Sequence, residues 1–417
     1  MLSRFIHIDI KNIILTSSLL ISPVFFSIMS IIGIRHYGRE AGNLFVIFSV
    51  TFFTMCLLII FLNWFCNSVK FLFAHYIFML FIPIAIMIIF FIQYSGNRYV
   101  LSMFQFYLSF SLVSSFIGLY YSTNRQEFNK SFNCWVIIMW LLSIGILVEL
   151  LAHLFTVGYN LNLWRYQGLS YTASICYSLN LYFILFKNRI KIFRLCYKKI
   201  YRIASVLLLF FQIMCVFISG GRGGMVVVIL STLLIFSYSI KLNINRKAIV
   251  NVMTGLIVMF FLSFPILSNN EVIIRGASRL FNFITDTGID ITRTGRDGVY
   301  ALAIYGIRER PILGHGIFGQ FEFMNNNYPH NIFLEILLGG GVIYFLLSIF
   351  VFIIFFVKLN MLIEYDVKYM MLIPLTSYVF VFLSFSGSYI INGLFWFLVT
   401  LVFTLKIDNK LKIDNYV

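Results

Sequence analysis

Apolar runs of about twenty residues recur along almost the whole chain and constrain its fold more than any other feature. A helix of ~20 apolar residues crosses the ~30 Å hydrocarbon layer of a membrane. On that rule the sequence predicts about twelve spans, at roughly residues 13–34, 43–63, 71–93, 99–121, 134–157, 169–187, 203–219, 225–240, 248–267, 332–357, 369–386 and 390–405. The last two, divided by Ser386-Gly387-Ser388, form either two spans or one re-entrant hairpin.

The composition excludes a water-soluble protein, because 61% of the residues are hydrophobic and only 11% are charged. We therefore expect an all-α polytopic membrane protein, with residues 1–417 forming one integral domain. The first apolar run is long enough to span and no small-residue cleavage site follows it, so it is interpreted as a retained helix. The six cysteines form no CxxC pair and none lies in the long break described next, which argues against a disulfide framework or a zinc site.

Positive charges in the breaks between spans predict the orientation. One alternate set of breaks holds all fourteen lysines and six arginines, and the other holds eleven arginines and no lysine. Short, lysine-rich breaks are typical of the cytoplasmic side. Both termini are then cytoplasmic, and the longest break, residues 268–330, becomes a large extracytoplasmic loop that we expect to contain short helices. The net charge of +16 therefore reflects topology, not nucleic-acid binding.

The outward positive charges are all arginine, which points to a phosphate ligand. A guanidinium group presents a fixed fork of donors that binds phosphate in a bidentate way, whereas an ammonium group is a compact, strongly hydrated point charge. Retention of lysine inside by topology selection explains any single arginine equally well. It explains the whole set less well.

Arg222 stands among four glycines, in Ser219-Gly220-Gly221-Arg222-Gly223-Gly224. This break is either a plain tight hairpin or a place where backbone N–H groups and the arginine meet an anion. We favour the anion, since a charge between two spans is costly without a partner. Arg165 precedes the polar span 169–187, where it either lines a wet cavity with Tyr171, Thr172, Ser174 and Asn180 or reaches out to the interface.

A helix is predicted within the long loop. Thr294-Gly295-Arg296-Asp297 matches a capping box with Thr294 as the cap, and Pro311 ends the helix. One face would carry Val299, Leu302, Ala303 and Ile307. Arg296 would then lie in the first turn, where free N–H groups favour an anion, and Arg293 would supply a second fork. Arg308 and Arg310 fall at the other end and are expected to be structural.

His330 and Asn331 begin the next span, in Pro329-His330-Asn331. Asn331 is expected to cap that helix. The positive helix end and partial desolvation both disfavour an imidazolium ion, which leaves His330 as a neutral base for a sugar hydroxyl. His315, in Gly314-His315-Gly316, is the competing candidate and ranks lower, because a turn between glycines orients a side chain poorly.

The order of these motifs resembles the O-antigen polymerase and O-antigen ligase superfamily of bacterial inner membranes. The shared features are a glycine-bounded arginine between two middle spans, one large later loop, and an arginine that opens a loop helix before Pro311-Ile312-Leu313-Gly314-His315-Gly316. A His-Asn pair follows, with Gly341 ten residues after Asn331, and the Arg165 to Leu169 stretch is also similar. The likeness covers roughly residues 160 to 400.

The resemblance implies a membrane glycosyltransferase. It would transfer an undecaprenyl-diphosphate-linked glycan onto the terminal sugar of another lipid-linked repeat, with inversion and without metal or other cofactor. His330, Arg296 and Arg222 would be catalytic, and Arg165, Arg293, His315 and Asn331 would contact substrate. The site would face the periplasm from the inner membrane, and a chain-length regulator protein is a possible partner.

Two alternatives are kept. A ligase would move finished glycan to lipid A core, but its pattern has a second glycine where this chain has Tyr344; close helix packing by Gly339-Gly340-Gly341 would compensate. A flippase for lipid-linked oligosaccharide would spread polar residues through many spans, whereas Glu149 is expected to be the exception in spans nearly free of charge.

Overall fold

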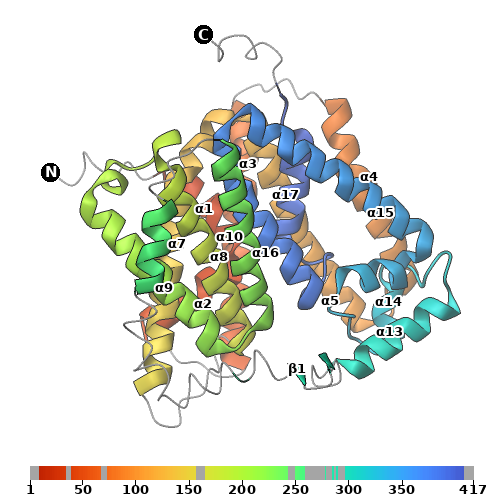
Figure 1. Ribbon diagram of the computed structural model, residues 1–417. Helices are drawn as coiled ribbons and strands as arrows, with labels where there is room; N and C mark the ends of the chain where they lie inside the picture. Colours follow the sequence, from red (N-terminus) through yellow and green to blue (C-terminus); the bar gives the residue numbers. More distant parts are fainter. Residues whose placement is uncertain are drawn as a thin grey trace.

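The computed structural model describes residues 9–33, 39–66, 73–155, 165–242, 249–258, 278, 284–285, 288–289 and 296–407. Figure 1 shows a bundle of long helices, with the later loop helices gathered at one end. The first half contains α1 (Ile10–Leu19), α2 (Ile21–Ile31), α3 (Arg39–Cys66), α4 (Phe73–Tyr94), α5 (Arg98–Phe106), the π-helix η2 (Tyr107–Leu112), α6 (Val113–Thr123), α7 (Arg125–Phe155) and α8 (Arg165–Phe186). The 3-10 helices η3 (Lys187–Arg189) and η4 (Arg194–Tyr197) follow, then α9 (Lys199–Ser219) and α10 (Arg222–Lys241).

The second half contains β1 (Ile284–Thr285), β2 (Gly288–Ile289), α13 (Asp297–Glu309), α14 (Gly319–Phe323), α15 (Ile332–Tyr365), η6 (Val367–Met371), α16 (Leu372–Phe385) and α17 (Gly393–Thr404). The loop contains short helices, as expected, and α13 is the one whose position was predicted. The antiparallel pair of strands, Ile284 opposite Ile289, was not. Strands of two residues need no alternating apolar run, so they leave no periodic pattern in the sequence.

The described residues confirm an all-α, multi-pass membrane protein. Eight helices are long and apolar enough to cross a membrane, and the bent pair α1–α2 makes up to nine. Shorter apolar helices lie at Ile84–Tyr94, Ile249–Val258 and Gly393–Thr404. These three lie within predicted spans but are shorter than a full crossing, so the described residues confirm eight or nine of the roughly twelve predicted spans.

The first predicted span is broken. α1 and α2 meet at Leu20 with a bend of 105°. Both still follow α7: the Cys134 thiol donates to the Asp9 carbonyl near one end, and the Ser30 hydroxyl donates to Glu149 near the other. The fifteen residues from Cys134 to Glu149 rise about 22 Å along that helix. The bent pair therefore crosses most of the layer beside α7.

α8 is the central helix of the bundle. The span that contains it is buried throughout, and α8 packs against α7, α9, α10 and α16. Its polar residues pair with these neighbours: Asn180 donates to the Ser205 carbonyl at 2.9 Å and to Gln212 at 3.2 Å, and Ser178 donates to Ser231 at 2.7 Å. Asn180 thus joins helices, as polar side chains do inside membranes, and does not line the cavity considered above.

The breaks between helices gather at two ends of the bundle. At one end, Lys241 pairs with Glu364 at 2.6 Å and Tyr182 donates to the Lys368 carbonyl at 3.2 Å. At the other, the Ser170 hydroxyl donates to the Gly221 carbonyl at 2.9 Å and Tyr94 donates to the His315 carbonyl. Each of these contacts joins segments next to breaks of the same set inferred from charge.

The last two helices cross the bundle separately. The span from Val367 to Phe385 has 19 residues, enough for a full crossing. α17 then returns, and the Lys358 ammonium donates to the Phe403 carbonyl at 2.7 Å near its end. The structure thus favours two spans over a re-entrant hairpin. Residues 386–392 connect them.

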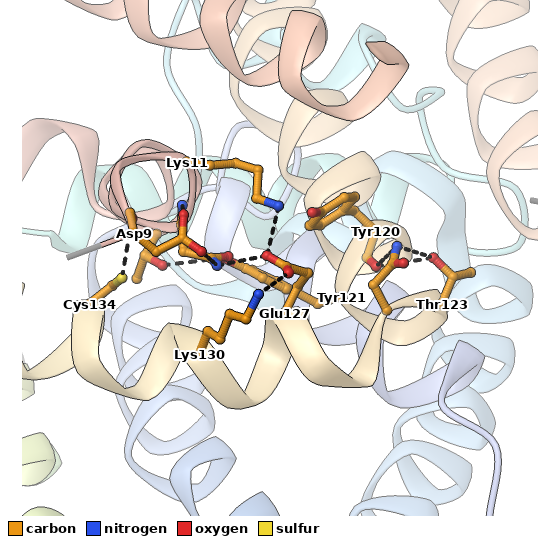
Figure 2. Close-up of polar contacts among 11 residues, drawn as sticks. Asp9, Lys11, Tyr120, Tyr121, Thr123, Glu127, Lys130 and Cys134 are labelled. Atoms are coloured by element: carbon orange, nitrogen blue, oxygen red, sulfur yellow. Dashed lines mark hydrogen bonds and ion pairs between the residues drawn. The ribbon is translucent and has the colours of Figure 1, made fainter. Parts of the chain in front are cut away.

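A polar network ties the start of α1 to α6 and α7 at the lysine-rich end (Figure 2). Glu127 receives hydrogen bonds or ion pairs from Lys11 at 2.8 Å, Lys130 at 2.7 Å and Asn12 at 2.9 Å. Its side chain is only 14% exposed. Asn12 accepts from the Tyr121 hydroxyl at 3.0 Å, which carries the network into the core.

We expect Glu127→Gln to destabilise the protein by about 1–3 kcal/mol, because three donors lose a charged and largely buried acceptor. The melting temperature in detergent measures this. Glu364→Gln is the matched control, since the pair of Glu364 with Lys241 at the same end is about half exposed and worth about 0–1 kcal/mol. Equal melting temperatures for the two variants would contradict the prediction.

Candidate functional site

The glycine-bounded turn places Arg222 at the first position of α10. α9 ends at Ser219, Gly220 adopts a left-handed conformation (φ 66°), and Gly221 caps α10. Gly223 faces the Tyr171 phenol and Gly224 faces Ser170, so neither position has room for a Cβ atom. These two glycines therefore serve close packing of α10 on α8, and the anion-binding role inferred for the turn from sequence stays a prediction. The packing fixes where Arg222 begins the helix.

Gly223→Ala is expected to destabilise the protein by about 1–3 kcal/mol, because the added methyl group overlaps the Tyr171 ring. Thermal unfolding in detergent is the measurement. Gly168→Ala, in the same region of α8, is the control: its Cβ would meet nothing within 4 Å. A Gly223 variant as stable as the Gly168 variant would rule out the close packing.

Asn331 caps α15, as the sequence predicted. Its side-chain oxygen accepts from the amides of Phe333 at 3.0 Å and Leu334 at 3.1 Å. Its side-chain amide donates to the Ser384 carbonyl at 3.2 Å, which links the cap to the end of α16. The cap holds the residue before it, His330, at the mouth of the helix.

His330 is held in a strained and specific position. Its φ of 55° is in the left-handed region, which costs about 1–3 kcal/mol for a residue other than glycine. Nδ1 lies 3.1 Å from the Ser386 carbonyl oxygen. A carbonyl oxygen only accepts, so Nδ1 carries the hydrogen and Nε2 of the neutral ring has a free lone pair.

The electrostatic surroundings of His330 keep the ring neutral. Burial lowers its pKa below the usual 6.5, the bond to the Ser386 carbonyl works against that change, and the Arg296 guanidinium lowers the pKa further. A neutral imidazole with a free Nε2 is a proton acceptor at neutral pH. The lowered pKa agrees with the neutral ring expected from sequence, and the role of His330 as a base stays a prediction.

Two tyrosines contact Ser386, Tyr328 at its carbonyl oxygen and Tyr171 at its hydroxyl. The Tyr328 hydroxyl donates to the same oxygen at 3.2 Å, and its ring lies 4.3 Å from that of His330, centroid to centroid. Burial raises the pKa of Tyr328 well above its usual value. The hydroxyls of Tyr171 and Ser386 are 3.1 Å apart, so Tyr171 connects this group to Gly223 and the Arg222 turn.

Arg296 approaches the same group from α13. It lies within electrostatic range of His330, Tyr171 and Tyr328. The helix begins at Asp297 with Arg296 as its N-cap, so the capping box headed by Thr294 is wrong. Asp297 occupies the first helical position, where its charge already complements the helix dipole. Arg296 is thus half-buried at the helix entrance instead of within its first turn.

The predicted face of α13 packs against α15. Val299, Leu302 and Ile307 surround a small core of Ala303, Met324 and Leu338, as expected. Arg308 lies in the last turn and Arg310 follows the helix, both exposed.

His315 is part of this packing and is buried, with 8% exposure. Its Nε2 lies 3.0 Å from the Gly306 carbonyl at the end of α13, and its ring lies 4.3 Å from that of Phe323. The backbone around it pairs with α15: the amides of His315 and Gly316 donate to the carbonyls of Leu338 and Gly339. His315 therefore holds α13 on α15 and is poorly placed for the substrate contact expected from sequence.

The three glycines of α15 have different neighbours: Gly339 faces Gln320 of the short helix α14, Gly340 faces Tyr344 of its own helix, and Gly341 faces the loop at Ile312. Gly341 has a φ of 63° and breaks the helix, and a Cβ there would overlap the Ile312 carbonyl. The Val342 amide donates to the Pro311 carbonyl at 2.9 Å. A loop can approach so closely only where side chains are absent.

A comparison with known protein families finds a match to the second half of the bundle. A model described as O-Antigen ligase matches residues 204–350, which include Arg222, Arg296 and His330. This part of the chain is similar to the O-antigen ligase family, which supports the resemblance to the O-antigen ligase/polymerase superfamily. Members of this superfamily are membrane glycosyltransferase-like enzymes. No curated protein and no solved structure matched the chain.

The structure brings several of the candidate site residues together, and the side chains of two others lie outside what it describes. His330, Arg296 and Asn331 share one site, and Arg222 starts the helix that packs on Tyr171. Arg293 lies outside the described residues. Arg165 begins α8, but its side chain lies outside what the structure describes.

Sequence reasoning missed the contacts at Ser386 that complete the site. Tyr171 and Ser386 are separated by 215 residues, and Tyr328 and Ser386 by 58. Glu335 was also passed over, although it lies in a predicted span and is fully buried there. The expectation that Glu149 is the exceptional charge of the spans was therefore wrong. A lone acidic residue five positions after His330 was the available signal.

Proposed function

We propose that this protein is an O-antigen polymerase. It takes a glycan linked through diphosphate to undecaprenol and transfers it to the terminal sugar of a second lipid-linked repeat. The proposal rests on the surroundings of His330. Its Nδ1 donates to the Ser386 carbonyl, which leaves the Nε2 lone pair to accept a proton, and the Arg296 guanidinium lies within electrostatic range. One integral domain in the inner membrane, with cytoplasmic termini and a periplasmic site, belongs to the same proposal.

The chemistry follows from these groups. Nε2 of His330 accepts the proton of the acceptor hydroxyl, and that oxygen forms a bond to the anomeric carbon. The bond from that carbon to the diphosphate oxygen breaks, and the leaving diphosphate takes the electron pair. Attack from the opposite face inverts the anomeric carbon. Arg296 and Arg222 stabilise the charge that develops on the diphosphate, which preorganised donors do best where water is excluded.

Two other functions compete with polymerisation. The description of the matched family model favours a ligase. The resemblance favours a polymerase because Tyr344 stands where ligases have a glycine, and its Cβ and ring fill the space beside Gly340. A flippase is less well supported, since it has no use for a positioned proton acceptor.

The test incubates the purified protein in detergent with a synthetic lipid-diphosphate repeat. Longer lipid-linked products support polymerisation. Transfer only to added lipid A core would instead identify a ligase, and no covalent product with either acceptor would favour the flippase. A strain that lacks the protein gives a second test. Lipid A core that carries a single glycan repeat indicates a missing polymerase, whereas core without any repeat indicates a missing ligase or flippase.

A further inference from the structure

Residues 386–392, which connect α16 to α17, determine how His330 is oriented. The Ser386 carbonyl is the acceptor for Nδ1, so the tautomer of the ring depends on where this backbone atom lies. A backbone carbonyl in a connection between helices keeps its place only if other contacts fix the connection. The question is which residue fixes it relative to His330.

Glu335 fixes the 386–392 connection relative to His330, and it does so from inside the protein. It lies in the first turn of α15, the helix that Asn331 caps, and its side chain is fully buried. Its Oε2 accepts from the Tyr389 amide at 3.3 Å, and its Oε1 accepts a short hydrogen bond from the Ser388 hydroxyl. Oε1 also accepts from the Gln320 side chain at 3.0 Å.

These contacts form a closed path. His330 precedes α15, Glu335 extends from its first turn, and the carboxylate binds Ser388 and Tyr389. Those residues follow Ser386, whose carbonyl returns to His330. A shift of the connection relative to α15 would have to break the hydrogen bonds at the carboxylate. A buried acceptor with several donors makes such a shift expensive.

We propose that Glu335 is a positioning residue that holds the Ser386 carbonyl against Nδ1 of His330 and so keeps Nε2 as the free base nitrogen. The catalytic consequence rests on the proposed polymerase function, but the effect on the tautomer does not. Glu335 acts through the 386–392 connection and does not itself contact the substrate.

The test compares Glu335→Leu, which removes both acceptor oxygens, with Glu335→Gln, which keeps one for the Tyr389 amide. The tautomer of His330 is measured by nuclear magnetic resonance of protein with ¹⁵N-labelled histidine rings, and the His330 signals are assigned by their loss in His330→Gln. The wild type should show a protonated Nδ1 and a bare Nε2. The leucine variant should show a mixture of tautomers, and the glutamine variant should remain close to the wild type.

The matched control is Gln320→Met, which removes the third donor to the same carboxylate without touching the 386–392 connection. It should leave the tautomer unchanged. If the protein polymerises as proposed, Glu335→Leu should lower kcat about 10- to 100-fold, as small misplacements of a base do, with little change in the KM for donor.

A single protonated-Nδ1 form in Glu335→Leu would overturn the positioning role, whatever the activity. If the leucine variant does not fold, Ser388→Ala decides: mixed tautomers support the role, and a wild-type spectrum overturns it. A wild-type protein that forms no polymer but shows the expected tautomer change would refute the polymerase and leave the positioning role standing.

Discussion

Replacing His330 by glutamine is expected to abolish polymer while leaving single-repeat glycolipid. Glutamine fills similar space and its amide can still donate to the Ser386 carbonyl, but it cannot accept a proton at neutral pH. Loss of a general base costs about 10²- to 10⁴-fold in rate. The measurement is the chain-length ladder of surface polysaccharide, together with product formation by the purified variant.

Tyr328→Phe is the matched control for this prediction. It removes the other donor to the Ser386 carbonyl and keeps a ring against His330. Chain growth should persist in this variant because the base itself is intact. Normal ladders from His330→Gln would remove His330 from the chemistry and leave the two arginines without a base.

The local parts of the site could be predicted from sequence because they depend on residues close together in the chain. Asn331 caps a helix by accepting from amides two and three residues later, so a short stretch of sequence is enough to predict the cap. The apolar face of α13 repeats at helical spacing and was also confirmed. The start of α13 was wrong, since Arg296 rather than Thr294 is its N-cap and the capping motif is only one of several ways to begin a helix.

The orientation of the base could not be predicted. The tautomer of His330 depends on the backbone carbonyl of Ser386, 56 residues later. Every residue has a backbone carbonyl, so the residue type at position 386 gives no sign of this contact. Glu335 meets Ser388 53 residues away and Gln320 15 residues before it. Contacts of this kind depend on how the helices pack, which periodicity and composition leave open.

The glycines show how one feature of the sequence can have more than one cause. Gly223 and Gly224 were recognised beside Arg222 and interpreted as part of an anion-binding turn. In the structure they face Tyr171 and Ser170 and permit α10 to pack on α8. Both causes require the absence of a side chain, so the sequence cannot separate them.

Arg296→Gln is expected to lower the rate by about 10²- to 10³-fold, the usual cost of removing one donor to a developing negative charge. The same change should alter the pH dependence, because the Arg296 guanidinium helps to hold the pKa of His330 below 6.5. In the wild type, His330 stays neutral until the pH falls through that lowered pKa. The fall of kcat/KM on the acid side of its pH profile, the acid limb, should therefore lie below pH 6.5. Without the guanidinium the limb should move to higher pH.

Arg296→Lys separates the two effects of the guanidinium. An ammonium group keeps the charge near His330, so the acid limb should stay near its wild-type position. It lacks the planar fork for diphosphate, so the rate should still fall. Arg308→Gln, on the exposed far end of α13, is the control and should change neither rate nor limb.

The profile of rate against pH for the three variants tests the shared site directly. A glutamine variant that loses rate while its acid limb stays in place would mean that Arg296 binds substrate without acting on His330. A limb that moves equally in the lysine and glutamine variants would show that the shape of the guanidinium, not its charge, governs the base. One outcome places Arg296 beside both the base and the diphosphate. The acid limb must move in the glutamine variant but not in the lysine variant, and the rate must fall in both.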